Sequence, residues 1–428
     1  MLRTVRVSVA IICFSLISLL FLDFTGTLHV WFGWLAKIQF LPALLALNVG
    51  VILSLLLLTL LFGRIYCSVI CPLGVFQDII AWFGKRGKKL PYTYSRALSW
   101  LRYGILIVFI IAVLAGVGSF VALLAPYSSY GRIISNLFAP LYQLGNNMFA
   151  YLAERAESYA FYEVDVWVKS LSTFIIALIT FGVLVLLAWR NGRTYCNTIC
   201  PVGTFLGIIA KYSLFKPVID VSKCNSCGLC ARHCKAACID SKKHKIDYSR
   251  CVVCLDCLDK CRHGAIKYMR RSAVKDKISS PVVTQDQIDS ARRNFLSVSA
   301  LFAATTVIKA QEKKVDGGLA VIEDKKIPNR VVALTPPGSL SVRNFAKHCT
   351  ACQLCVSVCP NQVLRPSGSL MTLMQPEMSY ERGYCQPECT KCSEVCPAGA
   401  IRPISVSEKS SIQIGHAVWI KENCVPLT

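Results

Sequence analysis

The sequence predicts an all-helical membrane domain followed by two small cysteine-rich domains of the α+β class. Three observations lead to this fold class. Four apolar stretches approach or exceed the ~20 residues that a helix needs to cross a bilayer. A motif of the form Gly-Arg-x-Tyr-Cys-x-x-x-Cys-Pro occurs twice, at residues 63–72 and 192–201. The chain has 23 cysteines, far more than packing requires, and most of them fall in regular runs.

The composition agrees with a membrane protein that carries soluble parts. Apolar residues make up 54% and charged residues 17% of the 428 residues, a length that suits two to four domains. A formal net charge of +23 would also suit nucleic-acid binding. The basic residues cluster beside the apolar stretches, however, where the positive-inside rule explains them, so nucleic acid is not a predicted partner.

The first domain, residues 1–216, is predicted to contain four transmembrane helices in two duplicated halves. These helices are expected at Val5–Leu22, Phe40–Phe62, Leu98–Ala125 and Val166–Trp189. A secretory signal is the alternative for the first stretch, but no small-residue cleavage site follows it before Leu28. We therefore expect a multi-pass protein of the inner (cytoplasmic) membrane.

The charges between these stretches predict the orientation of the helices. Basic residues precede the first stretch and separate the second from the third, whereas acidic residues dominate residues 126–165. The basic regions should be cytoplasmic and the acidic one external. Both Cys-Pro motifs then lie at the cytoplasmic membrane surface, and the two halves are parallel repeats about an axis along the membrane normal.

The cysteines of the two motifs are Cys67, Cys71, Cys196 and Cys200. Parallel repeats can bring these four thiols together, as a redox-active thiol site or as ligands of another metal centre. The alternative is that the Cys-Pro steps only shape helix ends. The amphipathic stretches that follow, Val75–Phe83 and Thr204–Phe215, are expected to lie in the membrane interface, either as part of a quinone pocket or as plain anchors.

The next region, residues 217–271, is predicted to be a bacterial-type ferredoxin domain with two 4Fe-4S clusters. Two successive runs have the spacing Cys-x-x-Cys-x-x-Cys-x-x-x-Cys, in which three thiolates bind one cluster and the fourth binds the other. The predicted ligands are Cys224, Cys227, Cys230 and Cys261 for one cluster, and Cys251, Cys254, Cys257 and Cys234 for its partner. Zinc is a weaker explanation because it needs only four ligands, and disulfides are disfavoured in the cytoplasm.

Residues 331–406 are predicted to form a second domain of this kind. Its first run has the same spacing, and its second run has one extra residue between the first two cysteines. The predicted ligands are Cys349, Cys352, Cys355 and Cys396 for one cluster, and Cys385, Cys389, Cys392 and Cys359 for the other. Four 4Fe-4S clusters are therefore expected. Of the remaining cysteines, Cys13 and Cys424 have no partner at ligand spacing, and Cys238 is interpreted as a core residue.

The linker, residues 272–330, contains a candidate export signal. Arg292 and Arg293 precede Phe295-Leu296 and an apolar run within residues 291–310, which matches the twin-arginine pattern. Because twin-arginine export moves domains already folded around their cofactors, the first ferredoxin domain would face the cytoplasm and the second the outside. The alternative is a basic tether on the membrane surface. Residues 407–428 are interpreted as a tail.

These motifs resemble those of a known family. Residues 1–271, with the repeated Cys-Pro motif and the first ferredoxin domain, resemble NapH, the membrane ferredoxin-type subunit of periplasmic nitrate reductase systems, within a wider group of NosR-like and CcoG-like proteins. From Arg292 onward, the twin arginines, Thr335-Pro336-Pro337-Gly338-Ser339-Leu340 and the following cysteine run resemble NapG.

The resemblance implies a quinol dehydrogenase module. Such a module takes electrons from the membrane quinol pool and passes them through iron–sulfur clusters to a partner redox protein or reductase, with lipid as its other partner. The sequence has no haem motif, dinucleotide fingerprint or phosphate loop, which favours a carrier over a terminal enzyme. The alternative, from the NosR-like and CcoG-like relatives, is an accessory protein that supplies electrons for metal-site maturation or copper reduction.

Overall fold

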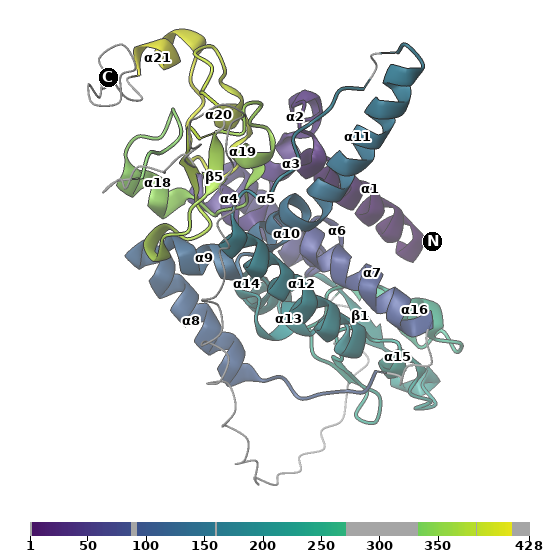
Figure 1. The fold of residues 1–428 in the computed structure, drawn as a ribbon. Helices are drawn as coiled ribbons and strands as arrows, with labels where there is room; N and C mark the ends of the chain where they lie inside the picture. Colours follow the sequence, from purple (N-terminus) through teal and green to yellow (C-terminus); the bar gives the residue numbers. More distant parts are fainter. Residues whose placement is uncertain (1, 87–91, 159–160, 271–332, 382, 413–428) are drawn as a thin grey trace, which may run out of the picture.

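A computed structural model describes residues 2–86, 92–158, 161–270, 333–381 and 383–412. Figure 1 shows a layer of helices with a cysteine-rich unit at each end. The first unit, residues 215–270, carries the short helices α15 (Leu229–Arg232) and α16 (Asp256–Lys260). The second unit, residues 333–412, begins its helices with α18 (Val342–His348) and ends them with α21 (Val406–Ser411).

Two helices of the described residues are long and apolar enough to cross a membrane, namely α1 (Leu2–Leu22) and α12 (Leu171–Asn191). Only 28% and 22% of their apolar windows are buried inside the protein. The core helix of a soluble protein would be mostly buried, so these two helices are suited to contact lipid. Two short helices, α2 (Thr27–Phe32) and α3 (Trp34–Lys37), follow α1.

The second expected span is broken. Residues 40–62 consist of α4 (Phe40–Leu45) and α5 (Val49–Phe62), separated by a turn in which Leu47 has a φ of 53°. The Asn48 side chain accepts a hydrogen bond of 3.3 Å from the Val51 amide and so caps the start of α5. The chain therefore starts a new helix here, although its hydropathy is continuous.

The third expected span is broken as well. Residues 98–125 consist of α8 (Ser99–Ala115) and α9 (Gly118–Leu124), and Gly116 between them has a φ of 75°. Glycine adopts this left-handed conformation at no steric cost, so it ends α8. The expectation of four continuous spans thus differs from the structure, in which only the first and fourth are single helices.

Large apolar side chains are nevertheless exposed along α1, α5, α8 and α12. Examples on the four helices are Val9, Ile12, Leu53, Leu57, Ile107, Ile111, Ile179 and Val183. Soluble proteins seldom expose contiguous apolar surface on this scale, whereas lipid-facing helices do so regularly. The belt between the two units is therefore a candidate membrane-contacting surface.

The two Cys-Pro motifs turn back into the helical layer. After α5, the short helix α6 (Tyr66–Val69) brings the Tyr66 hydroxyl to within 3.0 Å of the Gln39 side chain beside α4. Helix α7 (Pro72–Arg86) then packs against α1 and α12, with the Phe76 ring 6.0 Å from that of Phe181. The second motif repeats this order with α13 (Thr194–Thr198) and α14 (Pro201–Ala210), which packs against α5 and α8.

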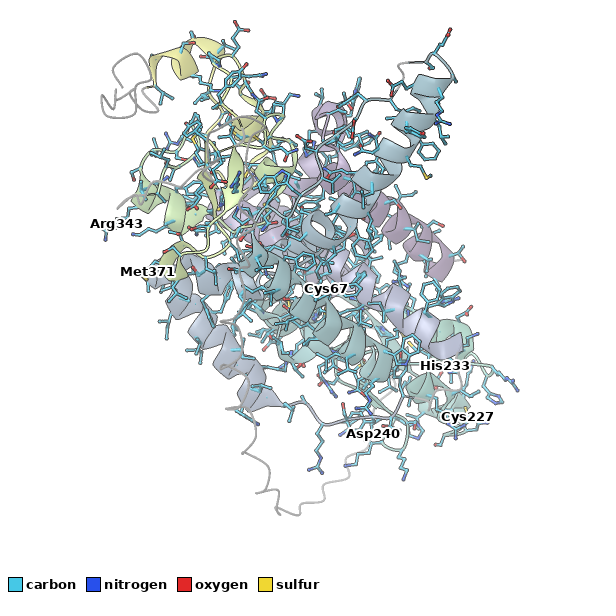
Figure 2. The ribbon with its side chains drawn as sticks, viewed as in Figure 1. Cys67, Cys227, His233, Asp240, Arg343 and Met371 are labelled. Atoms are coloured by element: carbon cyan, nitrogen blue, oxygen red, sulfur yellow. The ribbon has the colours of Figure 1, made fainter. Side chains whose placement is uncertain are left out.

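This packing adds to two expectations. The stretches Val75–Phe83 and Thr204–Phe215, predicted to lie in the interface, belong to α7 and α14 and pack against other helices. The four motif cysteines, predicted at the membrane surface, are each at most 4% exposed, and Figure 2 shows Cys67 in the middle of the molecule. Their burial comes from side-chain packing around the turns, which hydropathy does not report.

The segment expected to be an external loop is also helical and partly buried. All residues of α10 (Pro126–Ile133) are buried, and a π-helix, η1 (Ile134–Phe138), leads from it into α11 (Ala139–Arg155). Hydrogen bonds in a π-helix span five residues instead of the four of an α-helix, and such segments are frequent at functional sites. Helix α10 packs against α7, α9 and α12, so it belongs to the helical layer.

The first unit contains two small antiparallel sheets. Strand β1 (Phe215–Ile219) pairs with β4 (Ile266–Arg270), and β2 (Ile239–Asp240) pairs with β3 (Lys245–Ile246). A short 3-10 helix, η2 (Val221–Lys223), follows β1. Since β1 and β4 are the two ends of the unit, their pairing closes it.

The second unit has one such sheet, in which β5 (Leu364–Pro366) pairs with β6 (Pro376–Met378). A 3-10 helix, η3 (Leu370–Thr372), connects the two strands. The helices between the cysteine runs are α19 (Leu354–Ser357) and α20 (Lys391–Val395).

Opposite ends of the long helices contact different units. At the start of α1, Arg3 pairs with Asp256 of the first unit at 2.8 Å. Just beyond its end, the Thr25 carbonyl accepts a hydrogen bond from Lys391 of the second unit. Helix α12 runs the other way: Lys169 before its start donates to the Val356 carbonyl of the second unit, and the Arg193 amide after its end donates to the Lys235 carbonyl of the first. The helical layer thus separates the two units.

Candidate iron–sulfur sites and a buried thiol group

Three of the four predicted cysteine sets each line a single cavity. The first cavity is bordered by Cys224, Cys227, Cys230 and Cys261. The second is bordered by Cys234, Cys251, Cys254 and Cys257. The third is bordered by Cys349, Cys352, Cys355 and Cys396. In each case the fourth cysteine comes from the other run of the same unit, as the predicted exchange of ligands requires.

The fourth set also comes together. Burial, and then the neighbouring thiols of Cys359, Cys385 and Cys389, raise the pKa of the Cys392 thiol to about 12. The buried Lys409 ammonium, from α21, lies 3.3 Å from the Cys385 sulfur. Residues beyond 406 were interpreted as a tail, so this contact was missed, and nothing in the sequence around Lys409 signals it.

The backbone around the cysteines repeats in the same way in the first three runs. The residues immediately before and after the second cysteine are left-handed in each, with φ values between 50° and 72°: Ser226 and Gly228, Val253 and Leu255, Ala351 and Gln353. The residue three positions after each fourth cysteine is left-handed too: Ala237, Gly264, Gln362 and Gly399. Such turns direct backbone N–H groups into a concavity that suits an anionic cluster.

The spacing of the sulfur ligands fits a cluster better than a single ion. Each set combines three cysteines of one run with the fourth cysteine of the other run. A zinc ion also takes four ligands, but this exchange of the fourth cysteine between two runs is typical of two-cluster ferredoxins, in which each thiolate binds a different iron. The residues present therefore fit 4Fe-4S clusters.

Each unit has two sets of cysteines that differ in burial. We call the more buried set the inner set and the more exposed set the outer set. In the first unit the inner set is that of Cys234 and Cys254, both buried, whereas Cys227 of the outer set is exposed. In the second unit Cys349, Cys352 and Cys355 are buried, and the set of Cys392 is partly exposed. A cluster at an outer set would be the one accessible to a soluble partner.

Cys238, interpreted as a core residue, is buried but also touches the inner set. Its sulfur lies 3.5 Å from the Cys234 sulfur, and it borders the same cavity. Hydrogen bonds to Cys234 and Cys251, and then burial, raise the pKa of the Cys238 thiol. The neutral S–H group can therefore donate to one of these two ligands at a time, although Cys238 is not at ligand spacing itself.

The structure brings the four motif cysteines together in the helical layer. Cys200 interacts electrostatically with Cys196, Cys71 and Cys67, and Cys71 interacts with Cys67 and Cys196. Their sulfurs accept N–H groups: Gln77 Nε2 lies 3.2 Å from Cys196 Sγ, and the Gly203 amide lies 3.3 Å from Cys200 Sγ. We refer to Cys67, Cys71, Cys196 and Cys200 as the thiol group.

The arginines of the two motifs bind the backbone of the opposite copy. Arg64 donates to the Cys196 carbonyl at 3.1 Å, and Arg193 donates to the Cys67 carbonyl at 2.6 Å. The glycines two positions after each Cys-Pro step leave room for these arginines. A Cβ at Gly74 would be 2.7 Å from Arg193, and one at Gly203 would be 2.7 Å from Arg64. The two copies therefore interlock reciprocally around the thiol group.

Asp78 connects this region to the first unit. Its carboxylate pairs with Arg193 at 2.7 Å, Arg6 at 3.3 Å and Lys235 at 3.5 Å. Lys235 also pairs with Asp256 of the first unit at 3.2 Å. Asp78 was not among the residues predicted from the sequence. It is the sole acidic residue between Arg64 and Arg96, in an otherwise apolar and basic segment, and this isolation could have indicated a functional or structural role.

A larger cavity of about 360 Å³ lies between the helical layer and the second unit. Its lining combines aromatic and aliphatic side chains of α1, η1 and α12 with the polar side chains of Ser135, Lys169 and Gln353. Among the described residues, Ser135 Oγ and Gln353 Nε2 are buried without a hydrogen-bond partner. Burial lowers the pKa of Lys169, and the nearby thiols of Cys359 and Cys355 oppose this effect.

Some sequence predictions lie outside the described residues. These are the linker 272–330, which includes the twin-arginine segment 291–310 with Arg292 and Arg293, and Cys424.

Comparisons with known proteins agree with this chemistry. The 4Fe-4S binding domain family matches residues 44–91 and 173–221, one match for each Cys-Pro motif. The ferredoxin-type protein NapH of Haemophilus influenzae is 28% identical over 241 residues, which are 54% of this chain and 70% of NapH. No solved structure matches this chain significantly.

Two further relatives are similar over the same share of the chain. The putative electron transport protein YccM of Escherichia coli is 24% identical over 229 residues, 52% of this chain and 55% of YccM. The regulatory protein NosR of Stutzerimonas stutzeri is 24% identical over 205 residues, 46% of this chain and 23% of NosR. The chain thus spans about half the length of YccM and less than a quarter of NosR.

Proposed function

We propose that this chain, which is similar to NapH and NosR and matches the 4Fe-4S binding domain family at residues 44–91 and 173–221, is a membrane iron–sulfur protein that passes electrons from quinol to a partner reductase. The observation that carries this proposal is that three predicted cysteine sets each line one cavity, with ligands exchanged between runs. When bound there, 4Fe-4S clusters supply one-electron transfer. Each cluster would be held by one of the four sets of four cysteines, as the spacing predicts.

The domain organisation that we propose follows the described elements. Residues 1–216 form the membrane domain with parallel halves, and residues 217–271 and 331–406 form the ferredoxin domains. Two of these boundaries would move slightly. The first ferredoxin domain would begin at Phe215, where β1 starts, and the second would extend to Lys409, which binds back to the fourth cysteine run. The first ferredoxin domain is proposed to be cytoplasmic and the second external, because the helical layer separates them.

The cavity beside the second unit is the proposed quinol site. It is mostly apolar, as the quinol ring and tail require, and its few polar groups converge. Quinol oxidation releases two electrons and two protons. Ser135 and Gln353 can bind the two ring oxygens, and Lys169, whose pKa burial lowers, can accept a proton at Nζ and pass it to water. This location replaces the one expected beside Val75–Phe83 and Thr204–Phe215.

The test is quinol-dependent reduction of anaerobically purified protein, which should contain at least about sixteen iron atoms. A menaquinol analogue should bleach the cluster absorbance. Gln353→Leu and Lys169→Met should each slow this reduction at least about tenfold, the cost of losing one buried hydrogen bond to a substrate. Dithionite should still reduce both variants fully.

The control is Lys211→Met, which removes an exposed lysine far from the cavity. Rates in the two cavity variants equal to that of this control would contradict the quinol site. An iron content near eight at full occupancy would show that one ferredoxin domain is wrongly assigned.

The similarity to NosR favours a second candidate function, an accessory protein that supplies electrons for metal-site maturation or copper reduction. The two functions differ in what deletion of the protein changes. A maturation factor should leave its partner's cofactor incomplete, whereas a quinol dehydrogenase should leave the cofactor complete and remove only its supply of electrons.

A further inference from the structure

The thiol group has no role in the four clusters proposed above, yet it occupies the centre of the molecule. Figure 2 shows Cys67 between the end that carries Cys227 and the end that carries Met371. We propose that Cys67, Cys71, Cys196 and Cys200 ligate a fifth iron–sulfur cluster, which bridges the two ferredoxin units through the helical layer. The inference rests on the proposed iron–sulfur function of those units.

The first argument is the ligand set. Two cysteines come from each of two interlocked motif copies, and all four are at most 4% exposed. Four convergent thiols with this pairwise origin are the ligand set of 2Fe-2S and 4Fe-4S clusters. The two regions that match the 4Fe-4S binding domain family contain these four cysteines and none of those in the ferredoxin-type runs.

The second argument is charge. Arg64 is fully buried, and its guanidinium binds Asn197, the Ser249 and Cys196 carbonyls and the Cys67 sulfur. Among the described residues it has no carboxylate at ion-pair distance. Burying a cation without an anion is costly, and a cluster held by four thiolates is anionic. Arg64 is therefore placed as its counter-charge, whereas the twin residue Arg193 is already paired with Asp78.

The third argument is the set of N–H donors around the sulfurs. The Cys196 sulfur accepts a hydrogen bond from the Gln77 side chain, and the Cys67 sulfur accepts one from Arg64. The sulfurs of Cys71 and Cys200 accept hydrogen bonds from the backbone amides of Gly74 and Gly203 respectively. Those two amides lie in the first turns of α7 and α14, where the helix dipole favours a thiolate. N–H donors to sulfur stabilise thiolate ligands and tune cluster potential.

The fourth argument is the contact that the thiol group makes with each unit. On one side, Arg64 binds both the Cys196 carbonyl and the Ser249 carbonyl, two residues before Cys251 of the first unit's inner set. On the other side, Tyr195 lies within electrostatic range of Cys200 and of Arg132, and a Cβ at Gly131, next to Arg132, would be 2.4 Å from the carbonyl of Cys352 in the second unit's inner set. A cluster here would lie between the two inner clusters.

The test is the iron and acid-labile sulfide content of the anaerobically purified full-length protein. The inference expects about two or four iron atoms beyond the roughly sixteen of the ferredoxin-type runs, for a 2Fe-2S or 4Fe-4S centre respectively. Mössbauer spectroscopy distinguishes the two. A wild-type total of about sixteen would overturn the bridging cluster and leave the proposed function of the units intact.

Variants then assign the ligands. Cys67→Ser with Cys196→Ser should remove only the additional iron, and the ferredoxin-type signals should remain. Cys13→Ser is the matched control, because it removes a cysteine from α1 without touching the thiol group. Unchanged iron in the double variant would contradict the assignment. If that variant loses all its iron through misfolding, Arg64→Gln provides a second measurement: the additional centre should shift in potential or be lost, while Arg64→Lys should retain it.

Discussion

The two ferredoxin-type units contact the helical layer in different physical ways. Both approach the layer closely, but the first also forms salt bridges with it: Arg3 pairs with Asp256 and Asp259, and Lys235 pairs with Asp256 and Asp78. Among the described residues, the second forms no salt bridge with the layer and relies on close backbone approach, since a Cβ at Gly131 of α10 would be 2.4 Å from the Cys352 carbonyl. Charge pairs act at a distance and weaken in salt, whereas close packing does neither.

The difference suits units on opposite sides of one membrane. The first unit has an exposed outer cysteine set and an ion-paired attachment, as expected for a face that meets soluble partners. The inner set of the second unit is buried directly against α10, beside the proposed quinol cavity. Three substitutions separate these two modes of attachment.

The largest effect is expected for Asp78→Asn. The change leaves Arg6, Arg193 and Lys235 without the carboxylate that they share, and breaking a buried ion pair on one side costs about 3–5 kcal/mol. Denaturation in detergent, followed by cluster absorbance, should report a loss of this size. Asp165→Asn, at an exposed aspartate, is the control. A loss as small as in that control would mean that Asp78 does not hold the motifs to the first unit.

A smaller and more local effect is expected for Gly131→Val. The new side chain would meet the Cys352 carbonyl and the Phe21 ring, and overpacking of this kind costs about 1–3 kcal/mol. Spectroscopy should show iron lost from the second unit while signals of the first persist. Gly145→Val is the matched control, because nothing lies within 4 Å of a Cβ at that position. Equal loss from both units would contradict separate attachment.

The smallest effect is expected for Arg3→Gln. The Arg3 side chain is 44% exposed, and solvent screening limits such a pair to about 0.2–1 kcal/mol. The loss should appear at low ionic strength and disappear near about 1 M salt, where the screening length is about 3 Å. Arg96→Gln, an exposed arginine of the same end, serves for comparison. An effect that persists in high salt would show that Arg3 acts through packing.

Much of the candidate site was accessible from the sequence because the information is local. Three cysteines within seven residues, as in Cys224, Cys227 and Cys230, can reach only one cluster, and the structure brings the predicted fourth cysteine to the same cavity. Left-handed residues recur at fixed positions in these runs, so the chain itself builds the concavity. The extra residue before Cys389 is where this regularity ends in both sequence and structure.

Apolar composition likewise determined that helices fill the first half of the chain, but not where they break. Hydropathy adds up side chains and does not report a left-handed turn at Leu47 or Gly116. Hydropathy also predicted the Cys-Pro motifs at the membrane surface. A motif that ends an apolar stretch has no sequence feature that shows whether the chain then leaves the helical layer or turns back into it.

Only the tertiary structure decided what surrounds the motif cysteines. The reciprocal contacts of Arg64 and Arg193, and the ion pair of Asp78 with Arg193, join residues more than a hundred positions apart. A buried charge must find a partner wherever packing brings one, and sequence spacing does not encode that partner. The sequence by itself determined which residues can bind iron and sulfide, since that chemistry belongs to local runs of cysteine. The packing of the two motif copies decided that their four thiols meet between the two ferredoxin-type units.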